Sequence, residues 1–520
     1  TRPIEPDGNS NGGMTFKGGG SVTCKYPNTY TGTTTVEVGT TLIVKSAIAG
    51  DKLVFTIPDG LADGVYEVVR ISGSNEKFAE NVLDNVTQSP TARFVLNSAR
   101  TGIYLHNGNV EGDGKVWTGM AGDGKLSSAE NWLDNKTPAA GDILNFSAAT
   151  AILALNADLG DVTPSTMLFG TKVVTISEGT LNVSALTNAN KLAVASGATL
   201  NVAGDLVVCD ADGAFLHSNE GTVKVAGNAV CTTPTHAATT KQYVVVTSTA
   251  QPIQVGGLRY DKGTGGRVYW RMESNADGAG AWVVGANGFS FNNPENSYRA
   301  RFYAQGKPVT LYSSSDWTIP NTGLGNTTSG DLNIEQTSSL TIYTSDYDEP
   351  ENTAKKHTVT LEGRLKADGN VTITGCGTVE VATEYHSGQT MTDTTIASGK
   401  TLAVTDTATL RVNAGKKILG EGTISLAAGA TLKLMSGSDR KFPTFENLSL
   451  ALPAEGTATL CIDGETPLKS GDYVLFGNVT EGSAEHLTVA GTAAHHATVK
   501  VDERGLVLTV PPSGLSVIIR

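Results

Sequence analysis

A glycine-led phrase with two apolar positions recurs along the chain and decides the fold. It reads Gly399-Lys-Thr-Leu-Ala-Val404, then Gly422-Thr-Ile-Ser-Leu426, then Gly429-Ala-Thr-Leu-Lys-Leu434. Glycine suits a sharp corner because it adopts positive φ without strain. One polar residue separates the two apolar residues of each phrase, so both point to the same face of a β-strand. Each phrase therefore predicts a corner followed by a short strand with one buried face.

Further copies of the phrase extend the pattern toward the N-terminus. They are Gly179-Thr-Leu-Asn-Val183, Gly197-Ala-Thr-Leu-Asn-Val202, Gly221-Thr-Val-Lys-Val225 and Gly377-Thr-Val-Glu-Val381. Most steps between copies are about 18 to 24 residues, the length expected of one coil of a solenoid of strands. A single coil cannot bury its apolar face alone, so stability comes from stacked neighbours. The pattern favours a parallel β-helix over a β-sandwich, because sandwiches rarely repeat one glycine-led phrase at coil spacing.

The composition agrees with an extended β protein and excludes several classes. The 520 residues include 60 glycines, only 17% are charged, and the net charge is −13. Average proteins hold about 7% glycine and about 25% charged residues. An acidic chain without a basic face does not fit a nucleic-acid binder. Alternating hydrophobic residues argue against disorder, and the apolar runs are shorter than the ~18 residues that span a membrane.

Two segments interrupt the repeat and resemble each other. The first contains Leu53-Val-Phe-Thr-Ile57 and Asp63-Gly-Val-Tyr-Glu-Val-Val69, and the second contains Ala458-Thr-Leu-Cys-Ile462 and Ser470-Gly-Asp-Tyr-Val-Leu-Phe476. Each continues with a long loop and two more strands. We expect two copies of a small antiparallel β module that caps a β-helix and covers its open end. The second copy follows a long β-helix, whereas the first follows only a remnant at residues 14–47.

These features predict five parts of the chain. They are a partial β-helix at 1–51, an antiparallel β cap module at 52–110, the main parallel β-helix at 111–455, a second β cap module at 456–512 and an apolar strand at 513–520. The main β-helix includes an aromatic-rich elaboration at about 236–345, where the glycine-led phrase is absent. The chain starts at Thr1 rather than Met, which we interpret as a mature or processed form.

Two stretches resemble a known family. Residues 26–44 read Tyr-Pro-Asn-Thr-Tyr-Thr-Gly-Thr-Thr-Thr-Val-Glu-Val-Gly-Thr-Thr-Leu-Ile-Val. This closely resembles the bacterial autotransporter-associated β-strand repeat, with Thr33 where a second glycine is usual. Residues 116–146 resemble the opening of a new β-helix unit, in which two tryptophans cover the first coil. The residues that carry the resemblance are Asn28, Tyr30, Gly32, Gly39, Leu42, Trp117, Gly119, Asn131 and Trp132.

The resemblance implies a right-handed parallel β-helix. Together with the two interrupting segments, it predicts an all-β fold, a parallel β-helix (solenoid) with small antiparallel capping modules. It also implies a secreted or surface-displayed passenger, although adhesins, fibres and enzymes all use this scaffold. We therefore expect an extracellular or cell-surface location.

The sequence offers no convincing catalytic residues. A hydrolase of this shape needs two or three aspartates on adjacent coils, since an acid and a base must flank one bond, and no Asp-Asp pair occurs. The dense acidic cluster of Asp346, Asp348 and Glu349 is either a solvated loop or a weak Ca²⁺ site with oxygen ligands. We expect no cofactor and no enzymatic activity.

Other candidate residues have two interpretations each. Trp270 and Trp282 are candidate glycan contacts, because flat apolar rings can stack on sugars, and core packing is the alternative. The five cysteines are scattered singly, so no metal site is indicated. Cys209 and Cys231 either form a disulfide or are separate buried thiols.

The last residues suggest assembly. Leu515, Val517, Ile518 and Ile519 form an apolar strand after Pro511-Pro512. An apolar strand and the open edge of the 14–47 remnant are complementary, which predicts head-to-tail, non-closing association. The prediction is a non-enzymatic structural subunit of an extracellular or surface bacterial fibre, a homopolymer in which this strand completes the next subunit. Alternatives are an adhesin or carbohydrate-binding passenger fragment of a longer autotransporter-like protein, and a β-helical polysaccharide lyase or hydrolase. The strand could also pair within its own cap.

Overall fold

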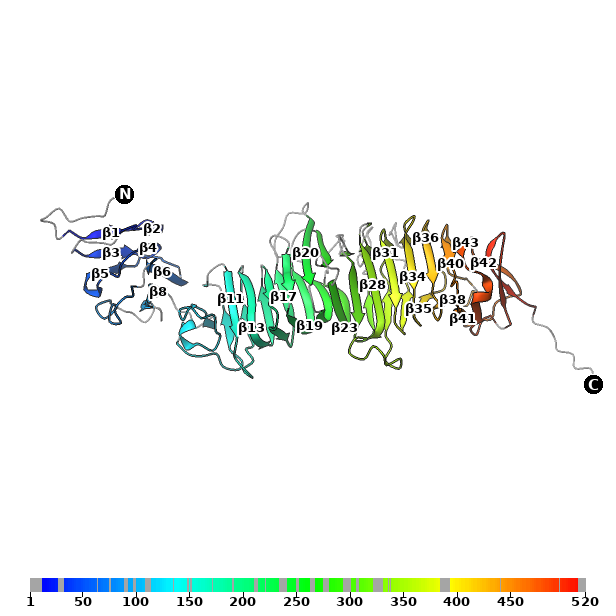
Figure 1. The fold of residues 1–520 in the computed structure, drawn as a ribbon, viewed down its shortest axis with the longest axis horizontal. Coiled ribbons are helices and arrows are strands. Elements are labelled where there is room, and N and C mark those ends of the chain that lie inside the picture. Colours follow the sequence, from blue (N-terminus) through cyan, green and yellow to red (C-terminus); the bar gives the residue numbers. More distant parts are fainter. Residues whose placement is uncertain are drawn as a thin grey trace, which may run out of the picture. The chain divides into compact units, whose positions relative to one another are not determined.

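The computed structural model describes most of residues 12–512 (Figure 1). The residues within this span that it does not describe are 27–31, 63, 74–75, 88–91, 97–99, 108–113, 134, 147–148, 150–151, 171, 189–190, 210–213, 220, 233–240, 249–251, 262–266, 275–279, 293–300, 305–307, 321–330, 335, 337, 384–392, 440 and 495. The chain divides into two compact units, Thr1–Asn188 and Ala189–Arg520. In the described parts, helical structure is confined to three 3₁₀ turns, η1 (Gly50–Lys52), η3 (Ala129–Asn131) and η4 (Ala484–His486).

The first unit begins with a module of short parallel coils. One sheet has the order β1 (Met14–Phe16), β3 (Thr34–Glu37), β5 (Leu53–Thr56), and the second begins β2 (Gly20–Thr23), β4 (Thr40–Val44), β6 (Gly64–Ile71). The second sheet then turns antiparallel, because β8 (Gly102–Asn107) pairs with both β6 and β7 (Ala92–Leu96). We call residues 14–107 the first module. It combines the predicted partial β-helix with the predicted antiparallel cap, and β5 belongs to the parallel part.

Apolar residues alternate along these strands and meet in one core. Val36 and Val38 flank Glu37, and Leu42 and Val44 flank Ile43; all four valine and leucine side chains are at most 2% exposed. Gly39 joins the two strands with φ of +97°, a conformation that glycine adopts without strain. Leu42 and Gly39 therefore have structural roles. Gly32 lies at a bend before β3, and Asn28 and Tyr30 are outside the described residues.

The rest of the first unit starts a second stack of parallel strands. One ladder contains β9 (Lys115–Val116), β10 (Ile143–Asn145), β12 (Thr166–Leu168) and β14 (Ala185–Asn188), and another pairs β11 (Ile152–Ala157) with β13 (Val173–Val183). Trp117 and Trp132 cover the start of this stack, with ring centroids 5.1 Å apart in a T-shaped arrangement. Phe146 and Phe169 continue the aromatic column, with centroids 4.8 Å apart.

Asn131 fixes the turn that carries these tryptophans. Its side chain is fully buried and accepts a hydrogen bond from the Ala121 N–H at 2.8 Å. Its amide group donates to Asp123 at 2.7 Å and to the carbonyl of Lys125 at 2.8 Å. Gly119 adopts φ of +66° and donates its N–H to the Asn131 carbonyl. The second group of motif residues thus forms one buried, hydrogen-bonded turn.

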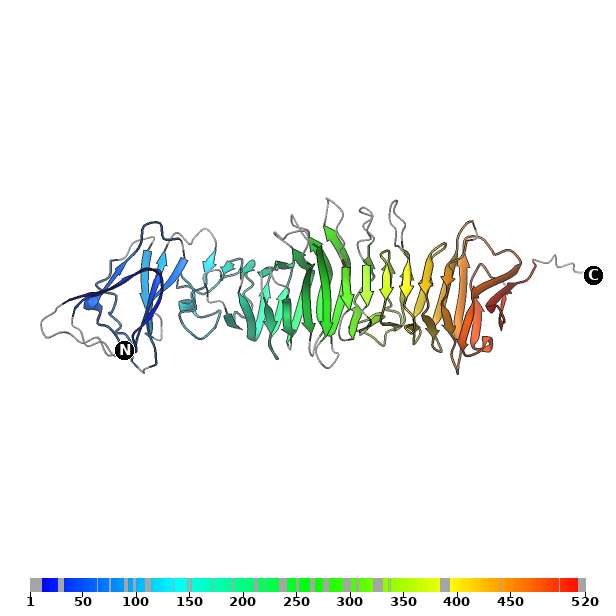
Figure 2. The same ribbon diagram turned by 90° about the horizontal axis from the view of Figure 1, so that it is seen from above.

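The second unit is a stack of parallel strands in three ladders (Figures 1 and 2). The first ladder contains β16 (Thr199–Val202), β17 (Leu206–Cys209), β19 (Thr222–Thr232), β21 (Ile253–Asp261), β23 (Gly280–Asn292), β25 (Val309–Ser313), β28 (Ser339–Asp346), β31 (Asn370–Thr374), β34 (Thr401–Val404), β37 (Thr423–Leu426), β40 (Ser449–Ala451) and β43 (Asn478–Glu481).

The second ladder contains β15 (Leu192–Val194), β18 (Ala214–Asn219), β20 (Lys241–Ser248), β22 (Arg267–Ser274), β24 (Arg301–Ala304), β27 (Asp331–Ile334), β30 (Leu365–Ala367), β33 (Thr394–Ile396), β36 (Lys417–Gly420) and β39 (Thr444–Glu446). The third contains β26 (Trp317–Ile319), β29 (Thr358–Leu361), β32 (Thr378–Val381), β35 (Thr409–Val412), β38 (Thr431–Ser436), β41 (Ala458–Gly464) and β44 (Leu487–Ala490). These parallel ladders confirm the predicted β-helix. In the aromatic-rich region β20, β21, β22 and β23 are long members of the first two ladders, and β26 begins the third.

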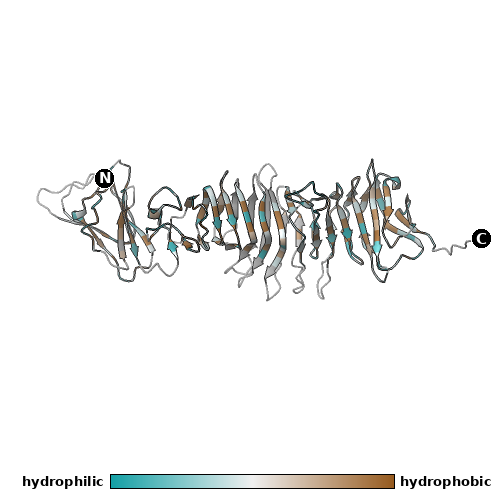
Figure 3. Ribbon diagram, turned by 90° about the horizontal axis from the view of Figure 1, so that it is seen from below, coloured by the Kyte–Doolittle hydropathy of each residue, from teal (hydrophilic) through white to brown (hydrophobic). Residues whose placement is uncertain are grey.

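Stacked apolar side chains form the core of the solenoid. In the third ladder Val359, Val379, Leu410, Leu432 and Leu460 lie one above another, and each is at most 1% exposed. Brown apolar segments accordingly recur from strand to strand through the stack (Figure 3). This inward column is the product of the repeated apolar–polar–apolar phrase.

The predicted coil spacing was too short at several coils. Thr401 pairs with Thr423, 22 residues later, but Thr378 pairs with Thr409, 31 residues later. The phrases beginning at Gly422 and Gly429 supply β37 and β38, which lie in different ladders of the same coil. Successive phrases are therefore often two sides of one coil rather than two coils.

The solenoid ends in a second antiparallel sheet with the order β42 (Gly471–Phe476), β46 (Gly505–Val510), β45 (Thr498–Asp502). We call residues 458–510 the second module. Its strands β41, β43 and β44 continue the parallel ladders, so the antiparallel part is narrower than the predicted cap at 456–512. No helix in the described part of the chain is long and apolar enough to cross a membrane.

Candidate assembly surface

The two modules share a distinctive tyrosine contact. The Tyr66 hydroxyl donates a hydrogen bond to the carbonyl of Ala62 at 2.8 Å, and the Tyr473 hydroxyl donates to the carbonyl of Lys469 at 2.9 Å. Each tyrosine thus bonds the residue four positions before it, across the turn that opens its strand. The same residue type makes the same local contact in both modules.

Strand register is also the same in the two modules. Tyr66 pairs with Leu105 and Tyr473 pairs with Leu508, and each ladder has its irregularity directly after, between Glu67 and Val69 or between Val474 and Phe476. The third strands, β7 and β45, have matching registers too. Phe94 of β7 pairs with Leu105, and Val499 of β45 pairs with Leu508. Within the three antiparallel strands, order, direction, register and bulge therefore agree, as expected of two copies of one module, although β6 also pairs in parallel with β4.

The two modules also share a short turn, which in the second module directly precedes β44. The first module has Ala79-Glu80-Asn81-Val82 and the second has Ala484-Glu485-His486-Leu487. Val82 donates its N–H to the Ala79 carbonyl, and Leu487 donates its N–H to the Ala484 carbonyl. Val82 is 1% exposed and Leu487 is 8% exposed, so both are inserted into their cores.

After this turn the two modules diverge. From Leu487 the second module continues as β44, which pairs in parallel with β41. From Val82 the first module makes further turns instead. The Asp84 N–H donates a hydrogen bond to the Asn81 carbonyl, and the Val86 N–H donates one to the Leu83 carbonyl. The strand β5, which is the counterpart of β41, therefore pairs only with β3 among the described strands. The strand position beside β41 is filled by β44 in the second module, whereas no described strand fills the corresponding position beside β5.

An apolar groove lies along the unpaired edge of β5. Its volume is about 360 Å³, and it is lined by Leu53, Val54, Phe55, Ile57, Asn85, Val86, Thr87, Ala92 and Phe94. Phe55 and Phe94 stack with ring centroids 4.5 Å apart. Val54 on β5 is 43% exposed, and Ile57, directly after the strand, is 39% exposed. We call this feature the β5 groove.

Sequence reasoning expected an open edge in the first module but did not identify the β5 groove. The sequence difference that indicates it follows the shared turn, where Leu83-Asp84-Asn85 in the first module corresponds to Thr488-Val489-Ala490 in the second. Aspartate and asparagine are depleted in strands, whereas threonine and valine are enriched. The predicted assembly residues Leu515, Val517, Ile518 and Ile519 lie outside the described residues.

The predicted glycan contact at Trp282 is wrong. Trp282 is 2% exposed and lies between Ile253 and Leu311 in the first ladder, so its ring belongs to the core. Trp270 lies on β22, and its side chain is outside the described part of the structure.

Two carboxylates of the acidic loop, those of Asp346 and Glu349, have partners within the loop. Burial raises the pKa of Asp346, but hydrogen bonds from His357 and from the N–H groups of Glu349 and Asp348 outweigh it, so the net pKa is lowered. The His357 Nε2 lies 3.0 Å from Asp346, and Glu349 pairs with Lys355. In the described residues no group of three or more His, Cys, Asp or Glu side chains is arranged to hold a metal ion.

The cysteines show no disulfide in the described part of the structure. Cys24, Cys376 and Cys461 are free thiols. Along the paired backbones of β17 and β19, Cys209 lies beside Thr232 and Cys231 lies beside Val208.

A polar groove crosses the outer face of the third ladder. About 400 Å³ in volume, it is bordered by Asp316, Thr360, Glu380 and Arg411 among others. Arg411 Nε lies 3.7 Å from Glu380 Oε1 and also borders a neighbouring hollow of about 580 Å³. In that hollow Lys433 hydrogen-bonds Asp463 and lowers its pKa to about 2. We call the two hollows the third-ladder groove.

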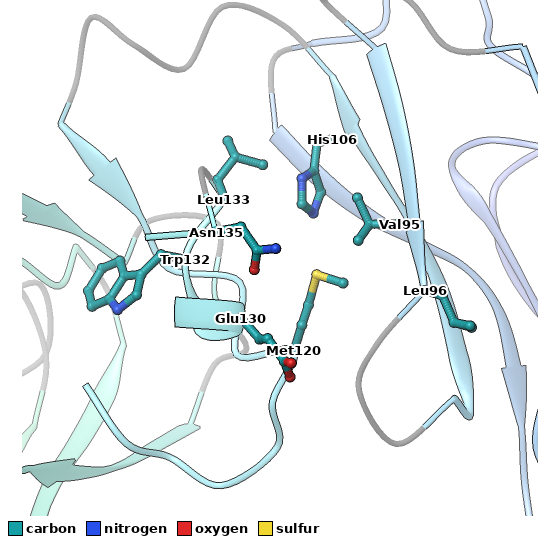
Figure 4. A pocket seen from close by; sticks show the side chains of 8 residues that line it. All are labelled: Val95, Leu96, His106, Met120, Glu130, Trp132, Leu133 and Asn135. Atoms are coloured by element: carbon teal, nitrogen blue, oxygen red, sulfur yellow. The ribbon is translucent and has the colours of Figure 1, made fainter. Parts of the chain in front are cut away.

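A smaller cavity lies within the first unit, between the antiparallel strands and the tryptophan turn (Figure 4). Its volume is about 190 Å³, and it is lined by Val95, Leu96, His106, Met120, Glu130, Trp132, Leu133 and Asn135. Among these lining residues the imidazole of His106 and the exposed carboxylate of Glu130 are the titratable groups. Apolar side chains surround them, and no arrangement of a nucleophile with a base is present among the lining residues.

No protein family, no curated protein and no solved structure matches the chain.

Proposed function

We propose that the protein is a non-enzymatic structural subunit of an extracellular or cell-surface bacterial fibre. In this proposal subunits assemble head to tail, and the apolar strand at 513–520 of one subunit completes the first module of the next. The observation that carries it is the vacant strand position at β5, which the second copy of the same module fills with β44. The resemblance of residues 26–44 to a repeat of secreted proteins supports the location.

Unpaired strand edges support assembly on physical grounds. An edge presents unpaired N–H and C=O groups that accept another strand, and proteins normally cover or disrupt such edges. Strand addition supplies main-chain hydrogen bonds for affinity and side-chain pockets for specificity. Because the donor and acceptor are different surfaces of the same chain, the contact is heterologous, the type of contact that builds a filament when it does not close into a ring.

Deleting residues 513–520 is expected to abolish polymers, because the donor strand is removed while the described fold stays complete. Val517→Asp should have the same effect, since it places a charge on the inward face of the strand. Ser516→Ala, on the outward face, is the matched control and should leave the polymers intact. Sedimentation velocity and electron microscopy measure the outcome. Polymers of unchanged length in the deletion variant would contradict the proposal.

A second candidate function rests on the third-ladder groove. It presents the carboxylates of Asp316 and Glu380 and the guanidinium of Arg411 along one open hollow, which suits the hydroxyl groups of a polysaccharide. In this alternative the protein is a carbohydrate-binding surface passenger.

If glycans bind in the third-ladder groove, Arg411→Ala is expected to weaken binding about tenfold or more, since a hydrogen bond to a charged group contributes about 1.5–3 kcal/mol. Lys441→Ala is the control, because Lys441 is a well-exposed cation outside the groove. A glycan array followed by calorimetry measures both variants. Equal binding by the two variants would exclude this groove.

A further inference from the structure

We infer that the β5 groove is the acceptor site for residues 514–520 of a second copy of this chain, which enter parallel to β5 with Leu515 beside Leu53. This inference rests on the proposed function and specifies the contact between subunits. It follows from comparing the two modules, because the second one already contains a strand at the equivalent position.

The β44 strand gives the direction and the register. It runs parallel to β41, with Leu487 beside Ala458, Thr488 beside Thr459 and Val489 beside Leu460. The segments Leu53-Val-Phe-Thr-Ile57 and Ala458-Thr-Leu-Cys-Ile462 correspond in the two modules, so Leu53 corresponds to Ala458. A strand seated like β44 would therefore begin beside Leu53.

The donor segment, residues 514–520, resembles β44 in its sequence. That strand is Leu-Thr-Val-Ala at 487–490, and the segment at 515–518 is Leu-Ser-Val-Ile. Both place an apolar residue, then a small hydroxyl residue, then valine. In β44, Leu487 is buried and Thr488 is exposed. By the same alternation Leu515, Val517 and Ile519 face the groove, and Ser516 faces outward.

The groove offers apolar contacts at the corresponding positions. Placing Leu515 beside Leu53 puts Val517 beside Phe55 and Ile519 beside Ile57. Leu53, Phe55 and Ile57 all line the groove, and the incoming side chains would cover part of the aromatic stack of Phe55 on Phe94. The apolar side chains of the donor strand would therefore meet apolar side chains of the β5 groove.

The opposite end of the first module is a weaker acceptor. Its terminal strand β2 has all four residues exposed, and β1 is only three residues long. An added strand there would gain main-chain hydrogen bonds but little side-chain burial. The described edges thus favour β5.

Disulfide trapping between two different chains tests the register. One full-length chain carries Val54→Cys and a second carries Ser516→Cys, because these residues lie beside each other in the inferred pairing. Neighbouring strands are about 4.8 Å apart, which suits a disulfide. Mild oxidation of the mixture is expected to give a linked dimer on a non-reducing gel.

Three controls define the result. The chain with Val54→Cys, oxidised without the Ser516→Cys chain, measures any disulfide formed with the native cysteines. Replacing Ser516→Cys by Val517→Cys should lower the yield about tenfold, because a shift of one residue turns the side chain to the other face. Thr15→Cys with Ser516→Cys tests the edge at β1.

The outcomes separate this inference from the fibre proposal. Efficient linking of Val54→Cys to Ser516→Cys, and not to Val517→Cys, supports the inferred site. Polymers that need residues 513–520 but link only through Thr15→Cys would overturn the β5 assignment and keep the fibre. No linked dimer from either Val54→Cys or Thr15→Cys with Ser516→Cys, together with an absence of polymers, would overturn both.

Discussion

Trp132→Ala is expected to destabilise the first unit by about 3–5 kcal/mol, the usual cost of removing a buried tryptophan. Trp132 is 2% exposed and packs edge-on against Trp117 and Phe146. Its indole N–H donates to the Leu126 carbonyl at 2.8 Å. The alanine variant therefore leaves a cavity and also leaves a buried carbonyl without its donor, which adds a separate penalty.

Urea unfolding followed by circular dichroism, together with hydrogen exchange at residues 116–133, measures this effect. Ile152→Ala is the control, since Ile152 is 73% exposed and should change stability little. Trp132→Phe should fall between the two, because it keeps an aromatic ring and loses the N–H. An alanine variant with unchanged exchange rates at 116–133 would show that the tryptophan turn does not pack as described.

Gly505→Ala is expected to destabilise the second module by roughly 2–6 kcal/mol, from backbone strain and overpacking together. Gly505 has φ of +101°, which disfavours any residue with a Cβ. An added Cβ would lie only 2.0 Å from the Phe476 carbonyl oxygen and 2.7 Å from the Gly477 carbonyl carbon. Both obstacles are backbone atoms, so a side-chain rotation cannot relieve the contact.

Gly477→Ala is the matched control because a Cβ there meets nothing within 4 Å and the backbone is not left-handed. It should be neutral or stabilising by about 0.4–1 kcal/mol, through the less flexible unfolded chain. Thermal unfolding and hydrogen exchange across β42, β45 and β46 compare the two variants. Equal stability of both would contradict the close approach of β46 to the end of β42.

The strands of the solenoid could be predicted from the sequence because the phrase is local. Gly429-Ala-Thr-Leu-Lys-Leu434 does form a corner and the strand β38, and its leucines are buried. The assignment of strands to ladders could not be predicted. Every side of the coil uses the same alternation, and only the length of the corners determines which phrases stack.

Only part of the candidate site, the repetition of the module, could be predicted from the sequence. The paired tyrosines Tyr66 and Tyr473 indicated two copies of one module, and their matching hydrogen bonds agree with that. The vacant strand position depends on where the chain goes after Val82, which is a question of tertiary packing. Trp282 illustrates the same limit, since a tryptophan suits either a sugar platform or a core, and burial decides between them.

The unequal coils of the second unit have a mechanical consequence. Each coil contacts mainly its two neighbours, so a solenoid pulled from one end yields coil by coil. A fully extended chain spans about 3.3–3.6 Å per residue, so a 22-residue coil such as the one from Thr401 to Thr423 releases about 75 Å of contour length. The 31-residue coil from Thr378 to Thr409 releases about 105 Å. Under tension the chain would lengthen in steps of differing size, and the step size would distinguish the short coils from the long ones.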